Sequence, residues 1–211
     1  MKRLTVFVTL AVFLVAANAS AQMAPAGKPN PVPKPQTIFS DNFNDGDTVG
    51  WYFPIGDWRV EKKVLVQTHG GDWNLALVPD HVLGSQSTEV MMSTNDPAGN
   101  GAIYFWRQDD ANNAGVLLYP HGVGLLVGHV YEGVGYDTII GGAYEDYTWY
   151  KIRVDADSET GVLTIFVNDV YVATYTVTTP VRSGLTGLHS GNTAGAFDNF
   201  RISRLGGGKK K

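Results

Sequence analysis

Aromatic and polar side chains occur together in two short segments, a combination suited to binding sugars. Trp73 lies in the loop sequence GGDWN, and Trp106-Arg107 is followed closely by Asp109 and Asn113. A sugar offers C–H faces that stack on flat rings, and hydroxyl edges that bond to carboxylate, amide or guanidinium groups. Three tyrosines border neighbouring turns, and we expect them to join the same ligand-binding patch: Tyr119, Tyr131 and Tyr136.

The sequence Asp-Asn-Phe occurs near both ends of the chain, at residues 41–43 and 198–200. In a strand, alternate side chains share a face, so Asp41 would lie on the side of Phe43, and Asp198 on the side of Phe200. Both carboxylates are therefore predicted to point toward an apolar layer. A carboxylate in that position needs a partner.

Histidine and glycine spacings do not indicate other common sites. The five histidines show no His-x-His or His-x-x-x-His spacing, so the sequence does not indicate a zinc site. The glycine-rich segment 122–128 lacks the spacing of a nucleotide-binding loop, and no helix is predicted after it.

Charge argues against nucleic acid as a partner. From Thr37 to Leu205 the sequence has nine basic and twenty acidic residues, a net charge of −11. Positive charge is concentrated instead in the terminal segment Gly206–Lys211, where three lysines follow three glycines. This flexible tail predicts, at most, a weak electrostatic contact with an anionic cell envelope.

The N-terminal segment predicts export. A basic start, an apolar run too short to span a bilayer and small residues at Ala19 and Ala21 are typical of a signal peptide covering residues 1–21. No later run is long and apolar enough to cross a membrane. Residues 22–36 hold five of the ten prolines and are interpreted as a linker. We therefore expect a periplasmic, cell-surface or extracellular protein.

Residues 37–205 predict an all-β domain. Short segments rich in Val, Ile, Thr and aromatic residues alternate with Gly, Asn and Asp clusters at intervals of 8 to 12 residues. About 13–14 strands without a convincing helix favour a two-sheet antiparallel β-sandwich of the jelly-roll type. The clearest hairpin turns at Asn168-Asp169, since both residue types tolerate positive φ angles.

The order of several motifs resembles a known superfamily. SDNFNDGDTVGW, GDWRVEKKVLVQ, GAIYFWRQDDANNAGVLLY, the segment 147–175 and GLTGLHSGNTAGAFDNFRIS together resemble the concanavalin A-like lectin/glucanase jelly roll, closest to its laminin-G-like and carbohydrate-binding-module branch. Related modules commonly hold a structural calcium ion where the first and last strands meet. The resemblance therefore implies that Asp41 and Asp198 are Ca²⁺ ligands.

Catalysis by the glucanase mechanism of this superfamily is not supported. Glucanases of this fold carry Glu-x-Asp along one strand, but no glutamate of this chain has an aspartate two residues later. We therefore predict a secreted, non-catalytic, lectin-like protein that binds a glycan. Two alternatives stay open: a glycoside hydrolase of the keto-disaccharide hydrolase type, and a structural or self-assembling surface protein.

Overall fold

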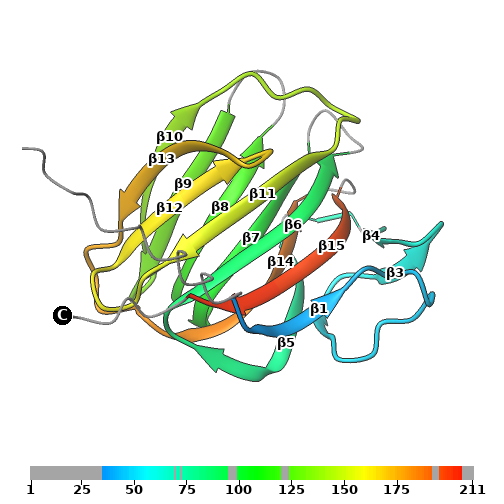
Figure 1. Ribbon diagram of the computed structural model, residues 1–211, viewed down its shortest axis with the longest axis horizontal. Coiled ribbons are helices and arrows are strands. Elements are labelled where there is room, and N and C mark those ends of the chain that lie inside the picture. Colours follow the sequence, from blue (N-terminus) through cyan, green and yellow to red (C-terminus); the bar gives the residue numbers. More distant parts are fainter. Residues whose placement is uncertain are drawn as a thin grey trace, which may run out of the picture. The chain divides into compact units, whose positions relative to one another are not determined.

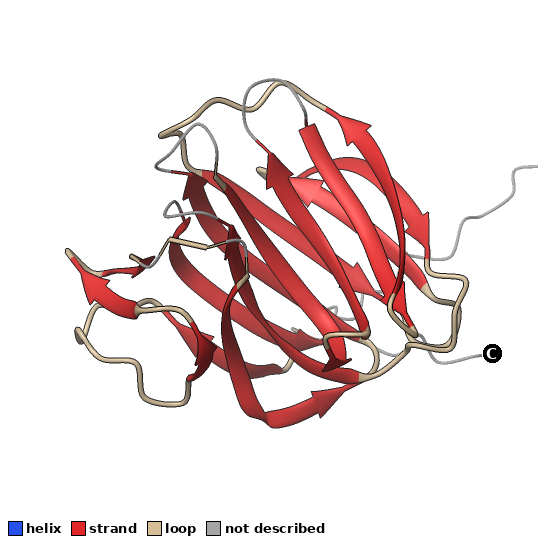
Figure 2. Ribbon diagram, turned by 180° about the vertical axis from the view of Figure 1, so that it is seen from behind, coloured by secondary structure: helices blue, strands red, loops and turns tan. Residues whose placement is uncertain are grey.

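The computed structural model describes residues 35–68, 70–71, 73–94, 99–119, 124–191 and 195–205. These residues form fifteen β-strands and no helix (Figure 2), so none of them belongs to a helix that could span a membrane. The predicted all-β sandwich is confirmed. The predicted signal peptide, nearly all of the predicted linker and the lysine tail lie outside the described residues.

One sheet contains eight strands, and it includes both the first and the last strand of the fold (Figure 1). Its main path runs in the order β13, β12, β11, β6, β15, β4, β3, and β1 pairs with β15 outside this path. The strands are β1 (Thr37–Asp41), β3 (Trp58–Glu61), β4 (Val64–Gln67), β6 (Gln86–Thr94), β11 (Tyr150–Ala156), β12 (Val162–Val167), β13 (Val170–Thr176) and β15 (Gly195–Arg204).

The other sheet contains seven strands in the order β10, β9, β8, β7, β14, β5, β2. β2 contains Pro54, and its place at the edge of the sheet explains why proline is tolerated there. The strands are β2 (Tyr52–Ile55), β5 (Asn74–Leu83), β7 (Asn100–Asp109), β8 (Asn112–Tyr119), β9 (Gly124–Tyr131), β10 (Val134–Gly141) and β14 (Gly184–Gly191).

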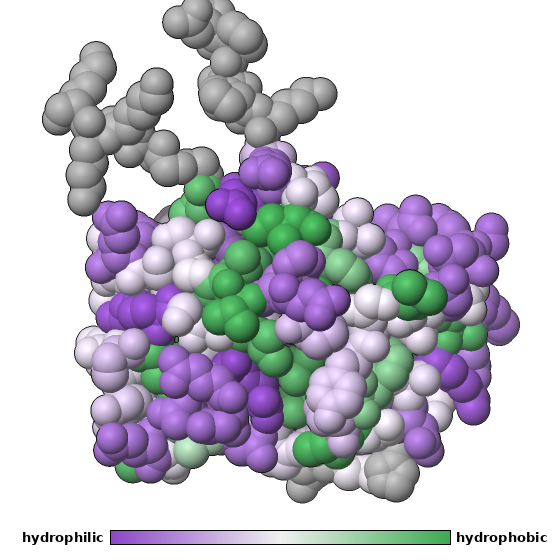
Figure 3. Space-filling view, turned by 90° about the horizontal axis from the view of Figure 1, so that it is seen from below, coloured by the Kyte–Doolittle hydropathy of each residue, from purple (hydrophilic) through white to green (hydrophobic). Residues whose placement is uncertain are grey.

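The core forms where the inward-facing sides of the two sheets meet. Strand β7 contributes Ile103 and Phe105, β9 contributes Val127, and β11 and β12 contribute Ile152 and Ile165, all nearly inaccessible to solvent. Burying each of these side chains contributes about 1.5–3 kcal/mol to folding. On the face seen in Figure 3, polar residues cover much of the surface, and apolar side chains gather along its middle.

Two turns have left-handed residues at both central positions. Asn168 and Asp169, between β12 and β13, have φ angles of 49° and 64°, as the sequence predicted. Lys62 and Lys63 connect β3 to β4 with φ angles of 51° and 67°. Such turns match the twist of the paired strands, but lysine is strained in this conformation.

A β-bulge in β15 overturns one orientation predicted from the sequence. Asn199 has a φ of 50°, and the register with β6 shifts between Asp198 and Arg201. Because of this extra residue, Phe197 and Phe200 are both buried, whereas Asp198 is partly exposed. The prediction that Asp198 lies on the side of Phe200 was therefore wrong.

Candidate functional site

A row of residues crossing the seven-stranded sheet forms the floor of a groove. Gly187 of β14 pairs with Tyr104 of β7, which pairs with Gly115 of β8. Gly115 pairs with Gly128 of β9, and Gly128 pairs with Asp137 of β10. Paired residues direct their side chains to the same face. The Tyr104 ring and the Asp137 carboxylate thus flank two strands whose residues in this row have no side chain.

This face lies opposite the core, because Tyr104 alternates with the core residues Ile103 and Phe105. The groove has a volume of about 590 Å³, within the range of small-molecule sites. A Cβ at Gly115 would lie 3.2 Å from the Tyr104 ring. A Cβ at Gly128 would lie 3.0 Å from the Asp137 Cβ. Glycine at both positions therefore keeps the floor open.

Three rings meet at one end of the groove. The ring centroid of Trp73 lies 5.1 Å from that of His189 and 6.3 Å from that of Tyr104. His189 and Tyr104 are 5.5 Å apart in an edge-to-face arrangement. Trp73 is 56% exposed, whereas the other two rings are buried. The cluster thus presents one accessible indole, held by two fixed rings, to a ligand in the groove.

Burial determines the protonation of these groups. It lowers the pKa of His189 to about 4, so the imidazole is neutral near pH 7. Burial, followed by the neighbouring Tyr119, raises the pKa of the Tyr104 hydroxyl far above its usual value, so this hydroxyl stays protonated. Burial also raises the pKa of Tyr119. These groups therefore offer the groove neutral hydrogen-bonding atoms.

Three buried polar atoms on groove residues have no hydrogen-bond partner in the part of the chain that the structure describes. They are Nδ1 of His189, Nε2 of His129 and Oδ1 of Asn100. Most buried polar atoms in folded proteins are paired, because an unmet hydrogen bond is costly. All three atoms are inaccessible to solvent in this structure, so a ligand hydroxyl would reach them only after their side chains turn toward the groove.

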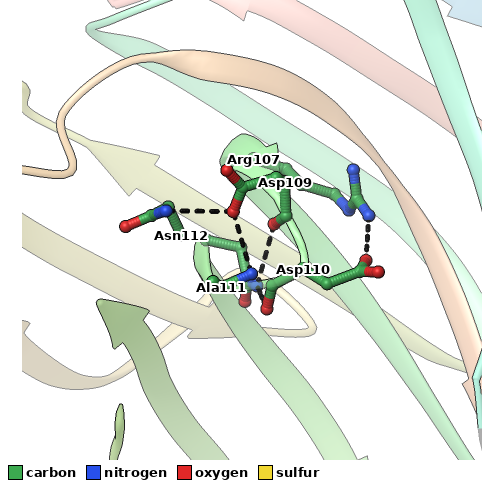
Figure 4. Close-up of polar contacts among 6 residues, drawn as sticks. Arg107, Asp109, Asp110, Ala111 and Asn112 are labelled. Carbon is green, nitrogen blue, oxygen red and sulfur yellow. Dashed lines mark hydrogen bonds and ion pairs between the residues drawn. The ribbon is translucent and has the colours of Figure 1, made fainter. Parts of the chain in front are cut away.

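A smaller pocket of about 270 Å³ adjoins the groove and shares Trp73, Tyr104 and Asn113 with it. Its remaining lining consists of Ile55, Leu75, Arg107 and Asp110. Arg107 forms an ion pair with Asp110, whose side chain is 84% exposed (Figure 4). The amide nitrogen of Asn113 is bonded to the carbonyl oxygens of Asp109 and Asp110, which fixes it at the boundary of the two pockets.

Trp106 is not part of this site, contrary to the sequence-based prediction. Its side chain is completely buried in the core, and its indole N–H donates to the carbonyl oxygen of Gly84 at 2.7 Å. Trp106 has a φ of 55° and sits in a bulge of β7, where the registers with β8 and β14 both shift. The bulge turns Trp106 inward beside Phe105 and places Arg107 on the outer face.

The other predicted binding residues separate into two groups. Trp73, Asn113, Tyr119 and Tyr136 line the groove, and Arg107 lines the smaller pocket. Two residues line neither pocket: Asp109 accepts bonds from Ala111 and Asn112 within the turn (Figure 4), and Tyr131 packs against the core.

Four residues that line the groove were not predicted from the sequence: Tyr104, His189, Asn100 and Asp137. Alternation within β7 and β14 places Tyr104 and His189 opposite core residues, and that signal was available in the sequence. Their proximity depends on β7 and β14 being neighbours, although they are separated by more than seventy residues.

The predicted calcium ligands are occupied by local hydrogen bonds. Asp41 accepts bonds from the Phe43 backbone N–H at 2.7 Å and from the Trp51 indole N–H at 2.8 Å, one on each oxygen. Both oxygens of Asp198 bond to Asn199. Among the described residues no group of three or more His, Cys, Asp or Glu side chains could hold a metal ion. Calcium at Asp41 and Asp198 stays a prediction.

Solved structures identify the fold. The carbohydrate-binding module CBM66 from Bacillus subtilis superimposes with a TM-score of 0.63 at 17% identity, covering 74% of this chain and 97% of the module. The carbohydrate recognition domain of Emp47p superimposes with a TM-score of 0.59 at 14% identity, covering 78% of this chain and 94% of that domain. The chain has the concanavalin A-like jelly-roll fold.

Within the same fold, the β-glucanase of Bacillus licheniformis gives a TM-score of 0.60 at 12% identity, covering 82% of this chain and all of the enzyme. No protein-family model matches the sequence, and no curated protein is similar to it in sequence. At these identities the similarity establishes the concanavalin A-like fold and not the ligand.

Proposed function

We propose that this protein is an exported, non-catalytic glycan-binding protein, and that its ligand lies in the groove of the seven-stranded sheet. The observation that carries the proposal is the open glycine floor at Gly115 and Gly128, flanked by aromatic rings on one side and the Asp137 carboxylate on the other. A sugar ring would rest on this floor, stack on Trp73 and bond to Asp137 through its hydroxyls.

Two residues that line the groove, His189 and Asn100, carry groups that suit the same ligand chemistry. A neutral imidazole and a carboxamide oxygen accept hydrogen bonds from hydroxyl groups, which sugars supply in number. The structural neighbours include proteins described as a carbohydrate-binding module and a carbohydrate recognition domain, which agrees with this proposal.

A non-catalytic role is favoured by the distribution of carboxylates. Glycoside hydrolysis commonly requires two carboxyl groups on either side of the scissile bond. Among the described lining residues, the groove contains Asp137, whereas the smaller pocket contains Asp110, which is paired with Arg107. Release of reducing ends from any bound oligosaccharide, lost in Asp137→Asn, would instead identify an enzyme.

A glycan array with the purified protein tests the proposal. Trp73→Ala should weaken binding to the selected glycan about fivefold or more, since ring stacking contributes about 1 kcal/mol. Tyr171→Ala is the matched control, because Tyr171 is 57% exposed and lies on β13 of the other sheet. Equal binding by wild type and Trp73→Ala would remove the groove from the proposal, and no bound glycan at all would refute it.

A further inference from the structure

The smaller pocket differs chemically from the groove beside it. Ile55 and Leu75 give it an apolar wall, and Arg107 is the one lysine or arginine among the described residues that line either pocket. The Arg107 side chain is only 14% exposed. Holding a guanidinium group in such a place is costly unless it has acceptors.

Arg107 reaches the smaller pocket because the backbone at the preceding residue, Trp106, adopts a strained conformation. A left-handed φ is uncommon for a residue as bulky as Trp106, and such strain persists where the surrounding structure enforces it, often at functional sites. Regular alternation in β7 would bury position 107 on the core side with Phe105. The bulge reverses this and directs the guanidinium group into the pocket.

Among the described residues, Asp110 is the side-chain acceptor that contacts Arg107, and it leaves most of the guanidinium N–H donors without a partner there. Asp110 contacts Nη2, one of three guanidinium nitrogens that together carry five N–H donors (Figure 4). Because the Asp110 side chain is largely exposed, water competes for this pair and keeps it weak. A second carboxylate would fit the remaining edge of the guanidinium through two parallel hydrogen bonds.

We propose that the Arg107 pocket binds the carboxylate of a uronic acid unit, next to the sugar that rests on the glycine floor. This inference rests on the proposed glycan-binding function. Trp73 and Tyr104 line both pockets, so two adjacent units of one chain would contact the same rings. The negative charge of the domain opposes an acidic ligand at long range, but salt at 0.15 M screens charges beyond about 8 Å and leaves the contact at Arg107 largely intact.

The test compares acidic polysaccharides with their own neutral forms. Polygalacturonate, alginate and hyaluronan are each used before and after chemical reduction of the carboxyl group to an alcohol, and affinities are measured at 0.15 M salt. Wild type should bind at least one acidic polymer about tenfold more tightly than its reduced form. Arg107→Gln should lose this preference, and Arg107→Lys should keep only part of it, because lysine lacks the two-pronged geometry.

Arg153→Gln is the matched control. Arg153 lies on the outer side of the eight-stranded sheet, with its guanidinium 3.8 Å from the centre of the Phe166 ring, and its removal makes the same change in charge. This variant should keep the wild-type preference.

The outcomes separate the two proposals. Three outcomes would overturn the uronate assignment and leave glycan binding standing. The first is that wild type binds neutral glycans alone; the second is that Arg107→Gln keeps the wild-type preference for acidic polymers; the third is that Arg107→Gln loses equal affinity for the acidic and the reduced polymers. If wild type binds no polymer here and no glycan on the array, both proposals fail. Melting curves of each variant confirm that the compared proteins are folded.

Discussion

Replacing Trp106 with alanine should destabilise the protein strongly without altering the groove of the seven-stranded sheet. The side chain is completely buried in the core beside Phe105, and the Arg182 guanidinium lies 5.8 Å from its ring centroid. Alanine at this position would have the same left-handed backbone, so the change reports the lost side chain rather than relief of strain.

The expected decrease in the free energy of unfolding of Trp106→Ala has two parts, the lost burial of the side chain and the lost hydrogen bond. Truncating a buried tryptophan to alanine costs about 3–5 kcal/mol, through lost burial and the cavity left behind. Loss of the indole N–H leaves the Gly84 carbonyl without this bond, which adds about 1 kcal/mol. The free energy of unfolding should therefore fall by about 4–6 kcal/mol, and the melting temperature by about 10–20 °C for a domain of this size.

Urea denaturation at 25 °C, followed by tryptophan fluorescence, measures the change. Trp106→Phe is a second variant in case the alanine protein does not fold; it keeps most of the apolar area and should lose about 1–2 kcal/mol. Glycan affinity of the folded fraction should equal that of wild type for both variants. A Trp106→Ala protein of normal stability that no longer binds glycan would refute this reasoning and return Trp106 to the site.

Three further predictions concern stability. Lys63→Gly should raise the free energy of unfolding by about 1 kcal/mol, because glycine adopts the φ of 67° without strain; a melting temperature at or below that of wild type would contradict this. Burial lowers the pKa of His189 to about 4 from 6.5, so between these values the unfolded state binds more protons and stability falls as the pH falls. The loss from pH 7 to pH 5 should be about 2 kcal/mol in urea titrations and should be largely absent in His189→Gln. A calcium ion held by Asp41 and Asp198 predicts a lower melting temperature in chelator than in calcium, abolished by Asp198→Ala; superimposable curves would show that the hydrogen bonds of Asp41 suffice.

Alternation of residue types was enough to predict the all-β sandwich, because burial of one strand face is a local property of the sequence. The glycine-containing sequence GGDWN was enough to place Trp73 in a loop, where its side chain is 56% exposed. Alternation failed at two bulges, where one residue enters the left-handed region and every later side chain changes sides. Asn199 gives a weak warning, since asparagine tolerates positive φ, but nothing about Trp106 indicates that the following Arg107 will face outward.

The groove itself depends on contacts that are distant in sequence. Gly115 and Gly128 are separated by thirteen residues, yet they form one floor because β8 and β9 pair in a particular register. His189 joins Trp73 because β14 lies beside β5. Strand order is decided by the packing of both sheets together, so no short segment of sequence specifies it.

The pairing of β1 with β15 determines how the domain can be connected to other chains. Thr37 lies opposite Ser203, and the Arg204 N–H donates to the Gln36 carbonyl oxygen at 2.8 Å, so the entry and exit points of the domain are adjacent. Both lie in the eight-stranded sheet, whereas the groove faces away from it. Joining residues 205 and 37 by a short peptide, with new ends opened at the Asn168-Asp169 turn, should give a circular permutant that folds. Attachment to a carrier through either original end would leave the groove pointing outward.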